Sequence, residues 1–216
     1  MRFAPQTLLG LLTAATLAGC AAAIPASDPT PAPTLASLPD GAFLQTTDPG
    51  QPSPMGEDLD PDGITRVLPL TCGAPFASDA SVRQRRGRGF IYDFDPTPET
   101  TPTGTVDEVL TIFAPGGARL YLADVRSAAQ RCPGGSGEPS ESYAIVDSAA
   151  AGDESIVVSR TFYPDYGGQT IAITSFTAVV RLGDLVAVVA VHGWETNSAV
   201  RAHADEIVAA AVTRAR

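Results

Sequence analysis

The sequence contains no lysine and, in 216 residues, only three cysteines, two histidines and one tryptophan. All 14 basic residues are therefore arginines. A phosphate-binding loop that depends on a lysine is excluded, and two histidines are a thin basis for a zinc site. We expect no cofactor and no bound metal. The net charge of −10 and the pI near 4.5 argue against a general nucleic-acid binder, which needs a basic surface.

Long apolar runs are also scarce, and the clearest one lies near the N-terminus. Arg2 precedes the apolar run 8–17, which leads into the lipobox Leu17-Ala18-Gly19-Cys20. This pattern is typical of a signal peptide, and the run is too short for a permanent membrane helix, which needs about 20 residues. We expect residues 1–20 to be removed at Cys20 as a lipoprotein signal peptide. Acyl chains such as palmitate on the Cys20 thiol would then anchor the protein to the outer face of the cell membrane.

The other two cysteines, Cys72 and Cys132, form an even pair in a chain that the lipobox directs out of the cytosol. Disulfides persist in such compartments. We therefore expect one disulfide between Cys72 and Cys132.

Composition divides the rest of the chain into a tether and a domain. Residues 21–34 are rich in alanine and proline and cannot bury enough apolar surface to fold, so they predict a disordered tether. Residues 35–216 predict one folded domain with its core at 64–216. Leu35, Leu38, Phe43 and Leu44 can dock on that domain.

Periodicity predicts the elements of this domain. Apolar residues alternate in two segments before a helical stripe from Ala118 to Cys132, and four more strand-like segments follow. The predicted strands are 90–95, 106–112, 143–147, 156–162, 171–182 and 185–191. Gly183-Asp184 predicts a hairpin turn, and the fully apolar segment 185–191 predicts a central strand.

The last predicted element is a helix that Asn197 or Ser198 can cap. The order β-β-α-β-β-β-β-α indicates an α+β fold, a mostly antiparallel six-stranded sheet packed with two helices.

Two groups of side chains are candidate binding residues, and neither is catalytic. Arg83, Arg85, Arg86 and Arg88 form a basic cluster that could contact anionic lipid headgroups or wall polymers, or could be a solvated strand edge. Trp194, Tyr163 and Tyr166 lie near strand ends and turns and could form the rim of a glycan or lipid site. Ordinary packing is the alternative explanation for these aromatic residues.

Three other motifs are incomplete. Asp58-x-Asp60-x-Asp62-Gly63 matches half of a calcium loop, but Pro69 occupies the position of the bidentate glutamate, so we interpret it as a solvated acidic linker. His192 and His203 lack nearby ligands at metal-binding spacing and are expected to be packed or on the surface. The segment 134–138 approaches a nucleophile elbow, but Glu138 replaces its last glycine.

Several local motifs occur in an order that resembles a known family. These are a cysteine before the first strand, Arg131-Cys132-Pro133, the turn 152–155 and the hairpin 180–186. Together they resemble the PknH-like extracellular sensor domain of mycobacterial receptor kinases and actinobacterial lipoproteins. The resemblance implies a six-stranded antiparallel sheet with two helices and a cleft for an unidentified ligand. The arginine-only basic set and the lipobox also resemble an actinobacterial cell-envelope lipoprotein.

We therefore expect a non-enzymatic, lipid-anchored, extracytoplasmic sensor-like or ligand-binding domain. Its partners would be the membrane, through the lipid, and a cell-wall glycan, a lipid or a signalling protein. Two alternatives remain open at this point. A wall-associated hydrolase would line its largest pocket with a carboxylate pair or a Ser–His contact, and a structural envelope lipoprotein would lack a sizeable cleft.

Overall fold

A computed structural model describes residues 38–53, 56–67, 75–95, 101–131, 141–146 and 151–216. Its main feature is a seven-stranded antiparallel sheet in the order β1-β2-β3-β9-β8-β5-β4. Strands β6 and β7 form a separate two-stranded hairpin. The fold is α+β.

The strands are β1 (Glu57–Asp58), β2 (Val82–Tyr92), β3 (Gly104–Phe113), β4 (Glu141–Val146), β5 (Glu154–Phe162), β6 (Asp165–Tyr166), β7 (Gln169–Thr170), β8 (Ile173–Leu182) and β9 (Leu185–Gly193). The helices are the 3-10 helices η1 (Asp40–Ala42) and η2 (Ala77–Ser81) and the α-helices α1 (Pro61–Val67), α2 (Gly117–Arg131) and α3 (Arg201–Arg214).

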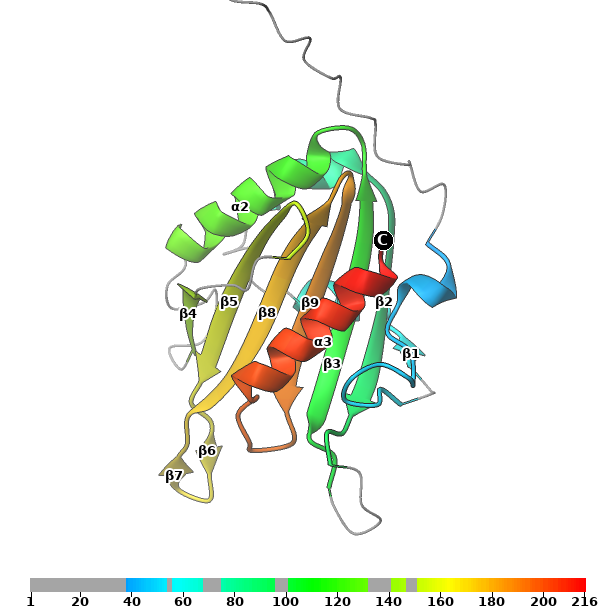
Figure 1. Ribbon diagram of the computed structural model, residues 1–216. Helices are drawn as coiled ribbons and strands as arrows, with labels where there is room; N and C mark the ends of the chain where they lie inside the picture. The colour runs from blue at the N-terminus through cyan, green and yellow to red at the C-terminus, as the bar shows by residue number, and fades with distance from the viewer. Residues whose placement is uncertain (1–37, 54–55, 68–74, 96–100, 132–140, 147–150) are drawn as a thin grey trace, which may run out of the picture. The chain divides into compact units, whose positions relative to one another are not determined.

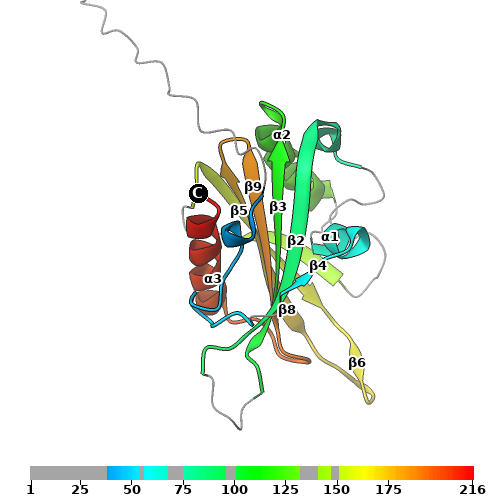
Figure 2. The same ribbon diagram turned by 90° about the vertical axis from the view of Figure 1, so that its right-hand side faces the viewer.

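Helices cover both faces of the sheet (Figures 1 and 2). On one face α3 and the segment around η1 enclose a core cluster that contains Phe43, Leu110 and Ile207. On the opposite face α1 and α2 enclose a second cluster that contains Val109 and Leu122. Since successive strand residues point to opposite faces, β3 contributes side chains to both clusters.

Strand β9 lies between β3 and β8, and its first seven residues form an uninterrupted buried run. Each residue from Leu185 to Val191 is buried, as the uninterrupted apolar segment predicts. Leu182 pairs with Leu185 across the Gly183-Asp184 turn, and Gly183 has φ +63°, so the predicted hairpin is confirmed.

Helix α2 follows Pro115 and Gly116, which interrupt the strand pattern. Its buried stripe contains Ala118, Leu122, Val125 and Ala129, as the helical spacing predicts. The six predicted strands correspond in order to β2, β3, β4, β5, β8 and β9, and the two predicted helices to α2 and α3. The predicted fold class is confirmed.

Strand β2 starts at Val82, eight residues before the predicted strand, so the arginine cluster lies within it. Polar residues on both faces conceal its alternation, but ten of its residues pair with β3. The structure also adds α1 and β1 in the acidic stretch that was expected to be loose. That stretch becomes ordered by tertiary contact, because Leu59 and Ile64 pack close to Gly87, which has no side chain to exclude them.

Two further details differ from the sequence predictions. The residue before α3 is Val200, which makes no side-chain cap, whereas Ser198 accepts a hydrogen bond from the Thr174 N–H at 3.0 Å. The predicted cap by Asn197 or Ser198 is therefore wrong, since Ser198 joins the loop to β8 instead. The predicted docking is confirmed for Leu38, Phe43 and Leu44, which are all buried, whereas Leu35 lies outside the described residues.

None of the helices in the described ranges has the length and apolar character needed to cross a membrane.

Candidate functional site

A pocket of about 370 Å³ lies on the face of the sheet that α1 and α2 cover. Its floor comes from β2, β3 and β9, and its walls come from α1, η2 and α2. Most of its lining side chains are apolar or carry methyl groups. The described lining residues are Ile64, Thr65, Val67, Phe76, Asp79, Val82, Arg85, Val109, Thr111, Tyr121 and Val188.

The charged groups of this pocket are Arg85 and Asp79. The Arg85 Nε donates a hydrogen bond to Thr111 Oγ1 at 3.0 Å, and Arg85 Nη2 lies 3.5 Å from Asp79 Oδ1. The second oxygen of Asp79 accepts a hydrogen bond from the Phe76 N–H. An apolar hollow with a few fixed polar groups is the usual form of a small-molecule site.

The aromatic wall of the pocket is centred on Tyr121. Its ring packs 5.6 Å from the Phe76 ring and 5.4 Å from the Phe113 ring, between centroids. Burial raises the pKa of Tyr121 to about 12, so its phenol is neutral at physiological pH. This wall therefore adds contact area but no charge.

The described lining of the pocket contains few side chains that could catalyse hydrolysis. Asp79 is the one carboxylate in that lining, which contains no serine, cysteine or histidine. A glycosidase needs two carboxyl groups across the scissile bond, and a serine hydrolase needs a base beside its nucleophile. The described lining residues contain neither arrangement.

Because successive residues of β2 point to opposite faces of the sheet, Arg86 and Arg88 lie on the other face from Arg85. Arg86 and Arg88 point to the α3 face, where both guanidinium groups lie over the Phe43 ring at 5.4 and 5.3 Å. Both contact the carboxylates of Asp40 and Asp58. The four arginines thus do not form a single basic patch, and contact with an anionic polymer stays a prediction.

Arg86 also binds the segment that contains Leu38 and Asp40. Its Nη1 donates to the Leu38 carbonyl oxygen at 2.9 Å and to Asp40 Oδ1 at 3.0 Å. The hydrogen bond from Arg86, together with the charge of Arg88, holds the pKa of Asp40 below its usual range. Arg86 and Arg88 therefore have structural partners, while Arg83 is exposed and forms no ion pair within the described ranges.

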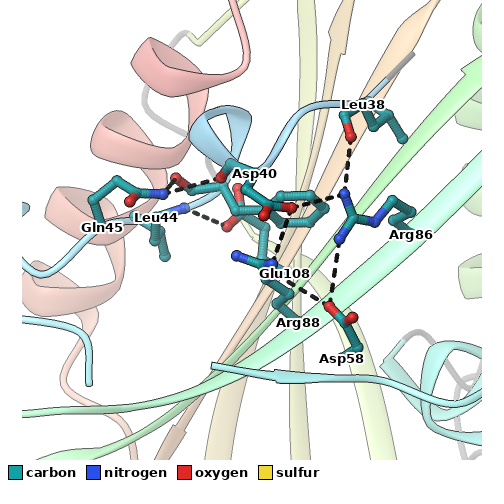
Figure 3. Close-up of polar contacts among 9 residues, drawn as sticks. Leu38, Asp40, Leu44, Gln45, Asp58, Arg86, Arg88 and Glu108 are labelled. Atoms are coloured by element: carbon teal, nitrogen blue, oxygen red, sulfur yellow. Dashed lines mark hydrogen bonds and ion pairs between the residues drawn. The ribbon is translucent and has the colours of Figure 1, made fainter. Parts of the chain in front are cut away.

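Glu108 is the buried carboxyl of this region, with no exposed surface. Its Oε2 accepts a hydrogen bond from the Leu44 N–H at 2.8 Å, whereas its Oε1 has no partner within the described residues (Figure 3). Burial raises the pKa of Glu108 to about 8, against the lowering effects of the Leu44 N–H and of Arg88. The group is therefore predominantly protonated at neutral pH and fastens the segment around η1 to β3.

A second hollow, of about 710 Å³, lies between the segment that contains Gly41 and Pro49 and helix α3. Its charged residues include Asp48 and Arg214, which pair with each other at 2.9 Å between Arg214 Nη2 and Asp48 Oδ1. Glu206 is a further charged residue of its lining, and the apolar side chains there are those of Pro49, Ala209 and Ala210. This hollow therefore offers an apolar ligand less contact area than the pocket that contains Arg85 does.

The expected aromatic rim is not part of the pocket lining. Tyr163 and Tyr166 are exposed, Tyr166 to 63%. Tyr163 lies between β5 and β6, and Tyr166 lies in β6, which forms the hairpin with β7 at one end of the sheet (Figure 1). Trp194 follows β9 and is partly exposed, and its backbone N–H donates a hydrogen bond to the Thr103 carbonyl oxygen. The structure does not bring these three residues together in one contact, and their binding role stays a prediction.

Neither histidine lies in a metal site within the described part of the chain. His192 Nε2 lies 3.6 Å from Asp107 Oδ2, and His203 stacks on Phe94 with ring centroids 4.0 Å apart. Both histidines thus have packing or polar partners, as expected.

The calcium-like motif also has a structural role. The Asp60 Oδ1 accepts the Gly63 N–H at the start of α1, and Asp58 pairs with Arg86 and Arg88.

Three cysteine and loop predictions lie outside the described residues. These are acylation at Cys20, the disulfide between Cys72 and Cys132, and the motif at 134–138. They stay predictions.

Sequence reasoning selected Arg85 but missed its neighbours Asp79, Thr111 and Tyr121, because three separate elements supply them. For Glu108 the sequence does contain a signal. It occupies the same alternation as Val106, Leu110 and Ile112, and this predicts an inward-facing carboxyl.

Comparison with known proteins gives a distant likeness in fold. No family model matches the chain, and no curated protein matches it. Among solved structures, the extracellular domain of PknH from Mycobacterium tuberculosis aligns with a TM-score of 0.48 and 14% sequence identity. The alignment covers 81% of this chain and 93% of that chain. A likeness at this level identifies neither a ligand nor an activity.

Proposed function

We propose that this protein is a non-enzymatic, lipid-anchored ligand-binding domain of the cell envelope, with a sensor-like role. The observation that carries the proposal is the apolar pocket of about 370 Å³ between α1, α2 and the sheet, with Arg85 among its few polar groups. Its volume falls in the range of small-molecule sites, about 300 to 1,000 Å³. The ligand would be a component of the envelope, and a partner protein would transmit the signal.

The described lining favours binding over the two alternatives. A hydrolase predicts a carboxylate pair or a Ser–His contact, and the described lining of the pocket of about 370 Å³ contains neither. The hollow of about 710 Å³ contains Asp48 and Glu206, but Asp48 is paired with Arg214. A purely structural protein predicts no sizeable cleft, and this domain contains one. The anchor is supported by the lipobox at Cys20 alone.

Thermal unfolding of the purified domain with pools of envelope lipids and glycans tests the binding proposal. Ligand at about one hundred times its Kd would stabilise the domain by roughly 2.7 kcal/mol, which raises Tm by about 5 to 10 °C. Thr65→Trp, at an exposed position of α1 that lines the pocket, should abolish the shift. Ala202→Trp, at an exposed position of α3, should keep it. Absence of a shift with every pool, or a shift that survives in Thr65→Trp, would contradict the proposal.

The anchor has a separate test. In cells labelled with radioactive palmitate, the wild-type protein should carry label and sediment with membranes. Cys20→Ser should carry none and should leave the membrane fraction, because one buried methylene contributes about 0.8 kcal/mol and the acyl chains supply many. A Cys20→Ser protein that stayed in the membrane fraction would refute lipid anchoring at this residue.

A further inference from the structure

We propose that the pocket binds a single-chain amphiphile with one negatively charged head group, which the Arg85 guanidinium holds while the apolar chain lies between α1, α2 and the sheet. This inference rests on the proposed function, since it names the ligand class of the same pocket.

The chain part of the ligand follows from the lining. Seven of the described side chains are aliphatic or aromatic, and both threonines carry methyl groups; the seven are Ile64, Val67, Phe76, Val82, Val109, Tyr121 and Val188. A polar ligand would leave its own donors unpaired against this surface, which costs affinity. An alkyl chain would instead gain affinity with length, by about three- to fourfold in Kd for each buried methylene until the pocket is full.

The head group follows from Arg85. Its side chain is 30% exposed, and within the described ranges only its Nε makes a short hydrogen bond, to Thr111. The contact with Asp79 is a looser 3.5 Å, and Nη1 donates no hydrogen bond to any described residue. A guanidinium has five N–H donors in a planar fork that matches a carboxylate or phosphate. Arg85 therefore keeps donors for an anion at the edge of an apolar hollow.

Arg86 and Arg88, on the same strand, provide the contrast. Their guanidinium groups are engaged by Asp40 and Asp58 and by the Phe43 ring, on the opposite face. Strand alternation thus separates the arginine that lines the cavity from those that hold the fold.

Asp79 sets the expected order of ligands. It is 44% exposed at the pocket rim and competes with an anionic head for Arg85. A cationic head would meet an Asp79 already paired and a guanidinium of its own sign. A neutral head would gain no ionic contact. The expected order of affinity is anionic, then neutral, then cationic.

Isothermal titration calorimetry with three ten-carbon probes tests this order: decanoate, decanol and decyltrimethylammonium. Decanoate should bind the wild-type protein at least tenfold more tightly than decanol. Arg85→Met should weaken decanoate binding about tenfold or more and leave decanol within twofold. Arg83→Met, two residues earlier and outside the pocket, should change neither.

Asp79→Asn supplies a second variant in case Arg85→Met folds poorly. The asparagine oxygen can still accept the Phe76 N–H, while the competing charge is removed. Decanoate should then bind several times more tightly, and decanol should bind as before.

The outcomes separate the two proposals. Equal binding of decanoate and decanol, both unaffected by Arg85→Met and Asp79→Asn, would overturn the anionic head group and leave pocket binding in place. Failure of decanoate to bind the wild-type protein would overturn the present inference, and the thermal shift with envelope pools would still decide the proposed function. Decanoate binding that is unchanged in Thr65→Trp would overturn both.

Discussion

Glu108 lies on β3 among residues of the α3-face core, and its Oε2 accepts the Leu44 N–H. A carboxylate in such a place would lose its hydration without a full set of partners, so burial favours the neutral acid. The pKa of Glu108 is raised from 4.5 to about 8. Arg88 and Asp48 act on it with opposite signs, and neither outweighs the burial.

The raised pKa predicts a dependence of stability on pH. The folded state holds the Glu108 proton more tightly than the unfolded state, so the contribution is complete below about pH 4.5 and is lost as pH rises toward 8. Relative to Glu108→Gln, which stays neutral, the wild-type free energy of unfolding should fall by a few kcal/mol between pH 5 and pH 8. Urea unfolding of both proteins across this range measures the difference. Parallel pH profiles would show that Glu108 has the same pKa in the folded and unfolded states, which would contradict the raised pKa.

In helix α2 the 3.6-residue repeat decides which side chains are buried and therefore how much each one stabilises the fold. Leu122 has no exposed surface and packs in the core with Val109 and Val125, whereas Leu120 is 43% exposed. The same residue type on one helix therefore has two different environments, two positions apart, as a 3.6-residue repeat requires.

Leu122→Ala should lower the free energy of unfolding by about 2 to 5 kcal/mol, through lost apolar burial and the cavity left behind. Leu120→Ala, the matched control, should change it by roughly 0.5 kcal/mol or less. Chemical denaturation with an unchanged m-value measures both. Similar losses for the two variants would contradict the placement of α2.

For the whole molecule, the N-terminal segment joins three parts of the fold. Leu44 bonds Glu108 on β3, Asp40 pairs with arginines on β2, and Asp48 pairs with Arg214 on α3. Leu38, Phe43 and Leu44 are part of the core. The segment is thus structural, although it precedes the first long strand.

A chain that lacks residues 1–34 should keep the free energy of unfolding of the longer protein. A chain that lacks residues 1–48 should lose at least about 5 kcal/mol, because it exposes the pockets of three buried apolar side chains and removes the Asp40 partner of Arg86 and the Asp48 partner of Arg214. Thermal and urea unfolding of both chains make the comparison. Equal stability of the two chains would refute a structural role for this segment.

The predicted disulfide between Cys72 and Cys132 also concerns the stability of the whole domain. In Cys20→Ser protein unfolded without reductant, thiol labelling should modify neither Cys72 nor Cys132. Reduction should destabilise the domain by roughly 4 kcal/mol, because the bond closes a loop of about 60 residues in the unfolded chain. Labelling of both residues without reductant would exclude the bond.

Much of the fold could be predicted from the sequence, while less of the candidate site could be. The six long strands and the helices α2 and α3 show clear periodicity and were predicted in the right order. The first half of β2 was missed, because Arg85, Arg86 and Arg88 put polar side chains on both faces. Helix α1 was missed because it is short and is positioned by tertiary contacts with Gly87.

The sequence by itself determined the order of the six long strands and of helices α2 and α3, which residues are buried in β9 and α2, and that one segment is rich in arginine. These are local properties, because the spacing of apolar residues and the charge of a segment can be recognised within a few consecutive residues. Only the tertiary structure decided that Arg85 faces a hollow while Arg86 and Arg88 hold the fold. Arg85 and Thr111 are 26 residues apart in the chain, and Asp79 and Tyr121 come from two further elements. Such neighbours meet only when the sheet and helices pack, and the same packing removes water from Glu108.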